Sequence, residues 1–319
     1  MCLIVFCKNI ESICNILIIP VSKVRIRLIN NLKCIKMKKC TLLFIALIFS
    51  ALCLKAFAQT KSYPFEVIKT GKGKQAIIFI PGFASSAEVW NETKSNFEKD
   101  FTCYTLTMAG FAGVKPQPNA TFENWKTEIA NYIKTNKIEK TIIIGHSMGG
   151  GLALAIAADY PELIGKIVVV DALPSLSALM DPSFKSKENN DCTPMVNQIT
   201  AMSDSQFYDM QKMSIPRLVE NISKQDLIID WSVKSDRKTF AEMYCDFSNT
   251  DLRNKISTIK CPALILLESY FVNLKPAIEA QYKNLKTANL QYANKGLHFI
   301  MYDDTEWYLQ QLNNFIKSK

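Results

Sequence analysis

The stretch Ile-Gly-His-Ser-Met-Gly-Gly at residues 144–150 lies between a β-branched run and a segment of helical spacing, 148–158. A serine at so sharp a turn from strand to helix is held with strained backbone angles, and the turn has no room for bulky side chains two residues before or after it. Gly145 and Gly149 occupy those two positions. The turn exposes the hydroxyl beside the first amides of the helix, which can bind an oxyanion. The pattern therefore predicts that Ser147 is a nucleophile.

Strand-like and helix-like segments alternate on both sides of this turn. Short apolar runs rich in β-branched residues predict strands at 75–80, 101–108, 141–144, 167–170, 263–267 and 289–292. Helical spacing is found at 87–98, 121–138, 275–286 and 305–317. Such alternation predicts an α/β protein with a mostly parallel sheet and helices on both faces.

The alternation stops over residues 173–252, a stretch rich in methionine and aromatic side chains. This stretch is too long for a loop. We interpret it as a helical cap over the C-terminal edge of the sheet, where open α/β sheets bind their ligands. Most of its apolar side chains are expected to pack the cap against the body of the protein.

The serine turn and the alternation around it resemble the α/β-hydrolase family over most of residues 65–319. The resemblance implies a mostly parallel central sheet, a helical cap inserted after the sixth strand, and Ser147 as the catalytic nucleophile. It also implies that the backbone amides of Met148 and Phe83 bind the oxyanion. Proline at position 81 replaces the more frequent histidine of the family and leaves the Phe83 amide available.

A serine hydroxyl is a poor nucleophile near neutral pH and needs a base within hydrogen-bond reach. The chain has two histidines. His146 adjoins Ser147 within the turn and is expected to point away from the hydroxyl. His298 follows the last predicted strand and precedes the final helix, where the family has its catalytic histidine, so His298 is the predicted general base.

The acid that orients this histidine is less clear from the sequence. Family members most often place an aspartate shortly after the strand corresponding to 263–267, but no Asp occurs in the six residues that follow it here. Asp171 directly follows the strand before the cap, where haloalkane-dehalogenase-like relatives have their acid, and is the preferred candidate. Glu268, in the usual loop, is the alternative, and Asp246 and Asp251 also remain open.

These residues predict a serine hydrolase that cleaves an ester or related acyl bond of a small to medium apolar substrate through an acyl-enzyme. A non-catalytic or weakly catalytic ligand-binding protein on the same fold is the alternative from another class, and an acyltransferase or perhydrolase is a further one. No cofactor is expected. With two histidines and no CxxC pair, no metal site of the usual zinc type is expected either.

Residues 1–58 are expected to lie outside the fold. A basic start at Met37, an apolar run over 42–54 and small residues ending at Ala58 resemble a secretory signal peptide. We interpret the residues before Met37 as a misassigned start, and we expect cleavage after Ala58 to leave a hydrolase domain at 59–319 that is secreted or periplasmic. The apolar run is shorter than the about 20 residues of a membrane span, so no stable span is expected in the mature chain.

The net charge of +9 does not indicate a nucleic-acid partner. Residues 1–58 hold nine of the 38 basic residues and one of the 29 acidic residues, so the remainder is nearly neutral. The expected partner is a small-molecule substrate.

Four of the ten cysteines follow the leader. Cys192 and Cys245 flank one helical part of the insert and are candidates for a disulfide in an exported protein. Cys103 and Cys261 lie in strand-like runs and are interpreted as small buried hydrophobic residues.

Overall fold

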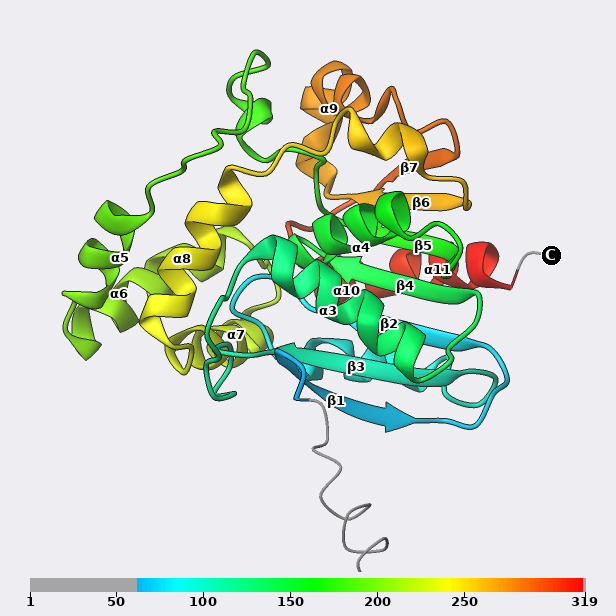
Figure 1. Cartoon of the computed structure of the whole chain (residues 1–319), viewed down its shortest axis with the longest axis horizontal. Helices are drawn as coiled ribbons and strands as arrows, with labels where there is room; N and C mark the ends of the chain where they lie inside the picture. Colours follow the sequence, from blue (N-terminus) through cyan, green and yellow to red (C-terminus); the bar gives the residue numbers. More distant parts are fainter. Residues whose placement is uncertain (1–61, 318–319) are drawn as a thin grey trace, which may run out of the picture. The chain divides into compact units, whose positions relative to one another are not determined.

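The computed structural model describes residues 62–317. The predicted leader, its start at Met37 and its cleavage site at Ala58 lie outside the described residues. The described part contains a seven-stranded sheet of order β1-β3-β2-β4-β5-β6-β7 (Figure 1). Only β1 is antiparallel to its neighbour. The strands are β1 (Phe65–Thr70), β2 (Ala76–Ile80), β3 (Thr102–Met108), β4 (Thr141–His146), β5 (Ile164–Val170), β6 (Ala263–Leu267) and β7 (Ala288–Tyr292).

The central strands are covered on both faces. All five residues of β2 and of β6 are buried, as expected for continuous apolar runs in a parallel sheet. Because successive side chains of a strand point to opposite faces, Ile77 and Phe79 join one hydrophobic cluster while Ile78 and Ile80 join the other.

Helices pack against each face. Residues of α3, α4 and α9 belong to the cluster that contains Ile78 and Ile80. Residues of η1 and α11 belong to the cluster that contains Ile77 and Phe79. The helices outside the insert are η1 (Ala87–Trp90), α2 (Asn91–Ser95), α3 (Phe122–Thr135), α4 (Met148–Asp159), η4 (Lys255–Thr258), η5 (Ser269–Leu274), α9 (Lys275–Tyr282), α10 (Ile300–Asp303) and α11 (Thr305–Ile316). The predicted α/β class with helices on both faces is confirmed.

The segment 173–252 runs between β5 and β6 and is called the cap below. Figure 1 shows its helices beyond the ends of the parallel strands. It contains η2 (Ser177–Leu179), α5 (Thr193–Thr200), α6 (Asp204–Ser214), η3 (Ile215–Arg217), α7 (Ile222–Val233) and α8 (Arg237–Ser248). One expectation needs correction: the cap follows the fifth strand of the described sheet, not the sixth, because only four strands precede β5.

A disulfide and a hydrogen bond tie the cap together. Cys192, at the start of α5, is bonded to Cys245 of α8, with the two Cα atoms 5.7 Å apart. The amide of Leu252 donates a 2.8 Å hydrogen bond to the carbonyl of Pro174, so the two ends of the cap meet. Among residues 62–317, no helix combines the length and the apolar character that crossing a membrane requires.

The two other cysteines of residues 62–317 carry free thiols. Cys103 is buried in β3, whereas Cys261 is half-buried. Burial raises the pKa of the Cys103 thiol to about 12 and that of the Cys261 thiol to about 11. Both therefore stay protonated near neutral pH and are poor nucleophiles.

Candidate active site

Ser147 occupies the turn between β4 and α4 with φ 54° and ψ −123°. A positive φ is strained for any residue with a side chain. The turn also explains both neighbouring glycines: a Cβ on Gly145 would lie 2.1 Å from the carbonyl oxygen of Gly149, and a Cβ on Gly149 would lie 2.3 Å from that of Ile80. The serine is thus held in its strained conformation by backbone segments that approach too closely for any larger residue.

His298 is bonded to Asp171 although 127 residues separate them. Nδ1 of His298 lies 2.6 Å from Oδ2 of Asp171, which is buried directly after β5. A carboxylate can only accept, so Nδ1 carries the proton of the neutral ring and Nε2 keeps its lone pair. Oδ1 of Asp171 accepts a 2.7 Å hydrogen bond from the backbone amide of Glu268. Both carboxylate oxygens are therefore engaged, and the histidine tautomer is fixed.

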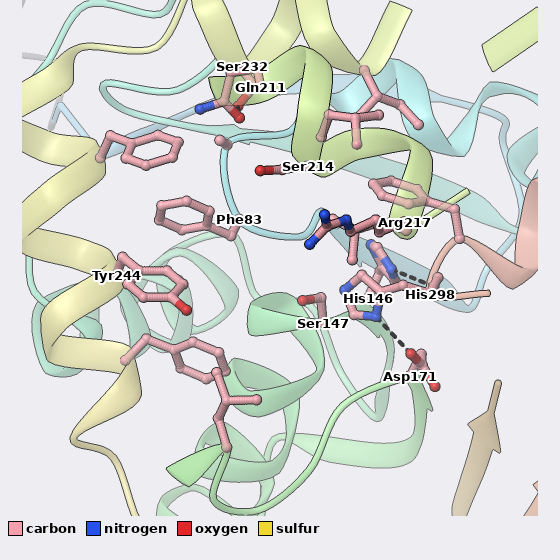
Figure 2. A pocket seen from close by; sticks show the side chains of 18 of the residues that line it. Phe83, His146, Ser147, Asp171, Gln211, Ser214, Arg217, Ser232, Tyr244 and His298 are labelled. Atoms are coloured by element: carbon pink, nitrogen blue, oxygen red, sulfur yellow. Dashed lines mark hydrogen bonds and ion pairs between the residues drawn. The ribbon is translucent and has the colours of Figure 1, made fainter. Parts of the chain in front are cut away.

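Ser147, His298 and Asp171 line one cavity of about 690 Å³. Figure 2 shows Ser147 on the side of the His298 ring that faces away from Asp171. No direct hydrogen bond joins the Ser147 hydroxyl to His298 within residues 62–317. The structure thus brings the predicted serine, histidine and aspartate into one site.

The other acidic candidates have different roles. Glu268 lines the cavity but reaches the Asp171–His298 pair through its backbone amide. Asp246 accepts a 2.7 Å hydrogen bond from the amide of Phe122 at the start of α3. Asp251 forms an ion pair with Arg253. Of the four acids considered from the sequence, only Asp171 forms a hydrogen bond with a histidine ring in the described structure.

Burial and charge shift the pKa values of the ionisable groups at this site. Burial lowers the pKa of His298, but the hydrogen bond from its ring to Asp171 and the charges of Asp171 and Glu268 outweigh this effect and raise it. Burial, and then the charge of Asp171, raises the pKa of Glu268 to about 7. His298 and Glu268 therefore influence each other's protonation within the cavity.

His146 supports the loop that carries His298. Its Nε2 lies 3.0 Å from the carbonyl oxygen of His298, to which it donates, and the centroids of the two rings are 4.6 Å apart. The side chain is fully buried, and burial together with the nearby His298 lowers its pKa well below the ordinary value. His146 is therefore a neutral donor. The sequence indicated that it points away from the hydroxyl but did not indicate this contact.

Phe83 follows β2, and Met148 is the first residue of α4. Neither backbone amide donates a hydrogen bond to another group in residues 62–317. Phe83 also lines the cavity with its side chain, in edge contact with Phe240 and Tyr244 of α8. The two predicted oxyanion donors thus have backbone amides without another partner in the described residues. Met148 adjoins Ser147 in the sequence, and Phe83 lines the cavity.

The cap supplies most of the remaining cavity wall. Its contribution is mainly apolar, with side chains such as Met195, Ile199 and Phe247. A small polar group was not predicted from the sequence: Gln211 and Ser232, joined by a 2.8 Å hydrogen bond, together with Ser214 and Arg217. The signal available for Arg217 was its place between the apolar residues 215–216 and 218.

Within residues 62–317, no group of histidine, cysteine and acidic side chains is arranged to hold a metal ion.

Known proteins resemble this chain in sequence and in fold. The family model described as alpha/beta hydrolase fold matches residues 75–192. A pimeloyl-[acyl-carrier protein] methyl ester esterase of Wigglesworthia glossinidia brevipalpis is 23% identical over 71% of this chain and 86% of its own length. An N-formylmaleamate deformylase of Pseudomonas putida is 22% identical over 77% of this chain and 90% of its own.

Solved structures agree. The enol-lactonase of Burkholderia xenovorans superimposes with a TM-score of 0.66 at 16% identity, covering 80% of this chain and 96% of that protein. An esterase of Thermogutta terrifontis gives 0.67 at 16% identity, covering 82% and 96%. Its sheet order, its strained serine turn and these matches together show that the chain has the α/β-hydrolase fold and resembles that family in sequence over residues 75–192.

Proposed function

We propose that this protein is a serine hydrolase that cleaves an ester or related acyl bond through an acyl-enzyme. In the first half-reaction the oxygen of Ser147 bonds to the substrate carbonyl carbon, and Nε2 of His298 takes the hydroxyl proton. The protonated histidine then gives that proton to the leaving group as the bond between carbonyl carbon and leaving group breaks. In the second half-reaction water attacks the acyl-serine by the same route and releases the acid.

The observation that carries this proposal is the 2.6 Å bond between Asp171 and His298 in the cavity that contains Ser147. The carboxylate fixes the tautomer with its lone pair on Nε2 and stabilises the imidazolium that forms when the serine proton is transferred. The raised pKa of His298 has the same cause. The relatives named above, a methyl ester esterase, a deformylase and an enol-lactonase, further support a hydrolase of ester-like bonds.

In this mechanism the amides of Phe83 and Met148 hold the developing oxyanion. Both amides are free of other partners in residues 62–317, and that of Met148 is at the N-terminus of α4, where the helix dipole favours negative charge. The loss of one such donor typically lowers kcat by about 10²–10³-fold.

The cavity favours a small to medium substrate with an apolar part. Its volume is about 690 Å³, within the ordinary range of small-molecule sites, and its cap-side wall is mainly apolar. Esters, thioesters and lactones share the reacting carbonyl, so the shape of the acyl and leaving groups decides among them.

Labelling with a fluorophosphonate probe tests the proposal. The intact protein should be labelled on Ser147, the Ser147→Ala variant should not, and His298→Ala should react at a small fraction of the rate. Ser214→Ala is a matched control, because Ser214 lines the same cavity but its hydroxyl donates to the carbonyl of Met210. Labelling that survives in Ser147→Ala would contradict the assignment of Ser147 as the nucleophile, and no labelling of the intact protein would favour the ligand-binding alternative.

We also propose that the protein is exported with cleavage after Ala58. The disulfide between Cys192 and Cys245 supports this, since such bonds persist mainly in oxidising compartments. Sequencing of the N-terminus of protein purified from its native cell should start at Gln59. A mature chain that still begins at Met1 would contradict both the cleavage and the proposed start at Met37.

A further inference from the structure

Arg217 is the one cationic Lys or Arg side chain that lines the cavity in the described structure. It belongs to η3 of the cap, and Figure 2 shows its guanidinium extending from the cap side toward Ser147 and His298. Since Arg217 is exposed yet lines the cavity, it stands where the cavity opens to solvent.

Arg217 has no anionic partner within residues 62–317. The two other arginines of this part are both paired: Arg237 with Asp204 and Arg253 with Asp251. Arg217 takes part in no ion pair or hydrogen bond there. A guanidinium that is not paired with a carboxylate of the protein keeps its five N–H donors available to a molecule bound in the cavity.

The acids that line the cavity do not neutralise this arginine. Asp171 uses both carboxylate oxygens, one on His298 and the other on the amide of Glu268. The charges of Asp171 and His298 act on the pKa of Glu268, but Glu268 forms no ion pair with Arg217 in the described residues. The positive charge at the cavity mouth is therefore unmatched by any acidic group of residues 62–317.

We propose that Arg217 binds a carboxylate carried by the substrate, so that the preferred substrate is an ester with a second, free carboxyl group. This inference rests on the proposed function and specifies its substrate class. A planar guanidinium matches a carboxylate with two parallel hydrogen bonds. At the mouth of the cavity the carboxylate stays partly hydrated, which limits its desolvation cost, while the apolar wall covers the carbon chain between the two carbonyl groups.

A monoanion fits this cavity better than a phosphate dianion. One guanidinium compensates one negative charge, and no second Lys or Arg lines the described cavity. The remaining charge of a dianion would face Asp171 and Glu268 without compensation. We therefore assign a carboxylate rather than a phosphate as the partner of Arg217.

A pair of substrates with equal chain length tests the assignment: 4-nitrophenyl hydrogen adipate, which carries a free carboxylate, and 4-nitrophenyl hexanoate, which does not. The ratio of their kcat/KM values should fall about tenfold in Arg217→Gln, because a hydrogen bond between charged groups is lost. Arg217→Lys should recover part of the ratio through its charge. Lys212→Gln, which removes a positive charge from an exposed part of α6 outside the cavity wall, should leave the ratio unchanged.

A binding experiment separates this proposal from the proposed function. Calorimetry on the Ser147→Ala variant should show that methyl hydrogen adipate binds about tenfold more tightly than methyl hexanoate, and that adding Arg217→Gln removes the preference. Equal binding of the two esters with Arg217 present overturns the inference, whatever the activity. Tighter binding of a phosphonate-terminated ester of equal length overturns the choice of carboxylate. A retained preference in a protein that neither hydrolyses esters nor reacts with the probe supports Arg217 and refutes the enzyme.

Discussion

The backbone amide of Glu268 donates a 2.7 Å hydrogen bond to the carboxylate of Asp171. The two residues directly follow β5 and β6, which are neighbours in the sheet. Their placement divides two tasks between two acids: Asp171 contacts the ring of His298, while Glu268 holds Asp171 through its main chain and adds a negative charge nearby.

Exchange of the two acids for their amides should therefore have unequal effects. Asp171→Asn is expected to lower kcat by about 10³–10⁴-fold, because the ring tautomer is no longer fixed and the imidazolium is no longer stabilised. Glu268→Gln keeps the backbone amide and should lower kcat by less than about tenfold, a loss of at most about 1.4 kcal/mol in transition-state stabilisation. Steady-state kinetics on a nitrophenyl ester measure both. A larger loss in Glu268→Gln would assign the acid to Glu268 instead.

The pH dependence of kcat/KM should report the raised pKa of His298. The general base works only when it is uncharged, so activity should rise as the pH increases through a pKa above the ordinary histidine value. Because the charge of Glu268 raises the pKa of His298, Glu268→Gln should move this acidic limb to lower pH. Profiles of kcat/KM against pH, measured for both proteins between about pH 5 and pH 9, show in which direction the acidic limb moves. A limb that moves to higher pH contradicts the electrostatic role.

His146→Phe should loosen the loop that carries His298. The aromatic ring preserves the packing against His298 and Phe299, whose ring centroids lie 4.6 and 4.7 Å from that of His146. The variant removes the hydrogen bond to the His298 carbonyl, so the free energy of unfolding should fall by about 1–3 kcal/mol. We expect kcat to fall more than KM rises. Denaturant unfolding and kinetics check this, and unchanged values in both would show that the contact is dispensable.

Reduction of the disulfide should destabilise the protein through the cap. The bond closes a loop with a sequence separation of 53 between Cys192 and Cys245. Its loss should cost about 2–4 kcal/mol, because the unfolded chain gains freedom. The double variant Cys192→Ser/Cys245→Ser should show a lower Tm than the oxidised protein, and a reductant should then have no further effect. An equal Tm in the oxidised protein and the double variant would argue against any stabilising role.

The features that the sequence predicted well have local causes. Strands β2 and β6 are fully apolar because both of their faces are buried. The serine turn needs Gly145 and Gly149 because backbone atoms occupy the space of any side chain. The edge strand β1 was missed, since only its first residue, Phe65, is buried and its other residues lack an apolar run.

The features that the sequence left open or did not predict depend on tertiary contacts; for the acid, it preferred Asp171 but left Glu268 as an alternative. Which acid reaches His298 follows from the parallel pairing of β5 with β6, which places Asp171 beside the histidine loop and leaves Glu268 one step away. The place of Arg217 in the cavity wall likewise depends on how the cap segment that contains η3 packs around the cavity. Neither the contact between Asp171 and His298 nor the place of Arg217 in the cavity wall can be inferred from the order of residues along the chain.

The hydrogen bond between the amide of Leu252 and the carbonyl of Pro174 makes the cap an interchangeable module. Its two attachment points meet shortly after the end of β5, before the chain continues through η4 to β6. A replacement segment of different length would therefore have to span only a short gap, and the cost of loop closure varies slowly with length. The nucleophile and the histidine lie outside the exchanged region. Replacing the cap at this junction is thus a way to change the acyl selectivity while Ser147 and His298 stay unaltered.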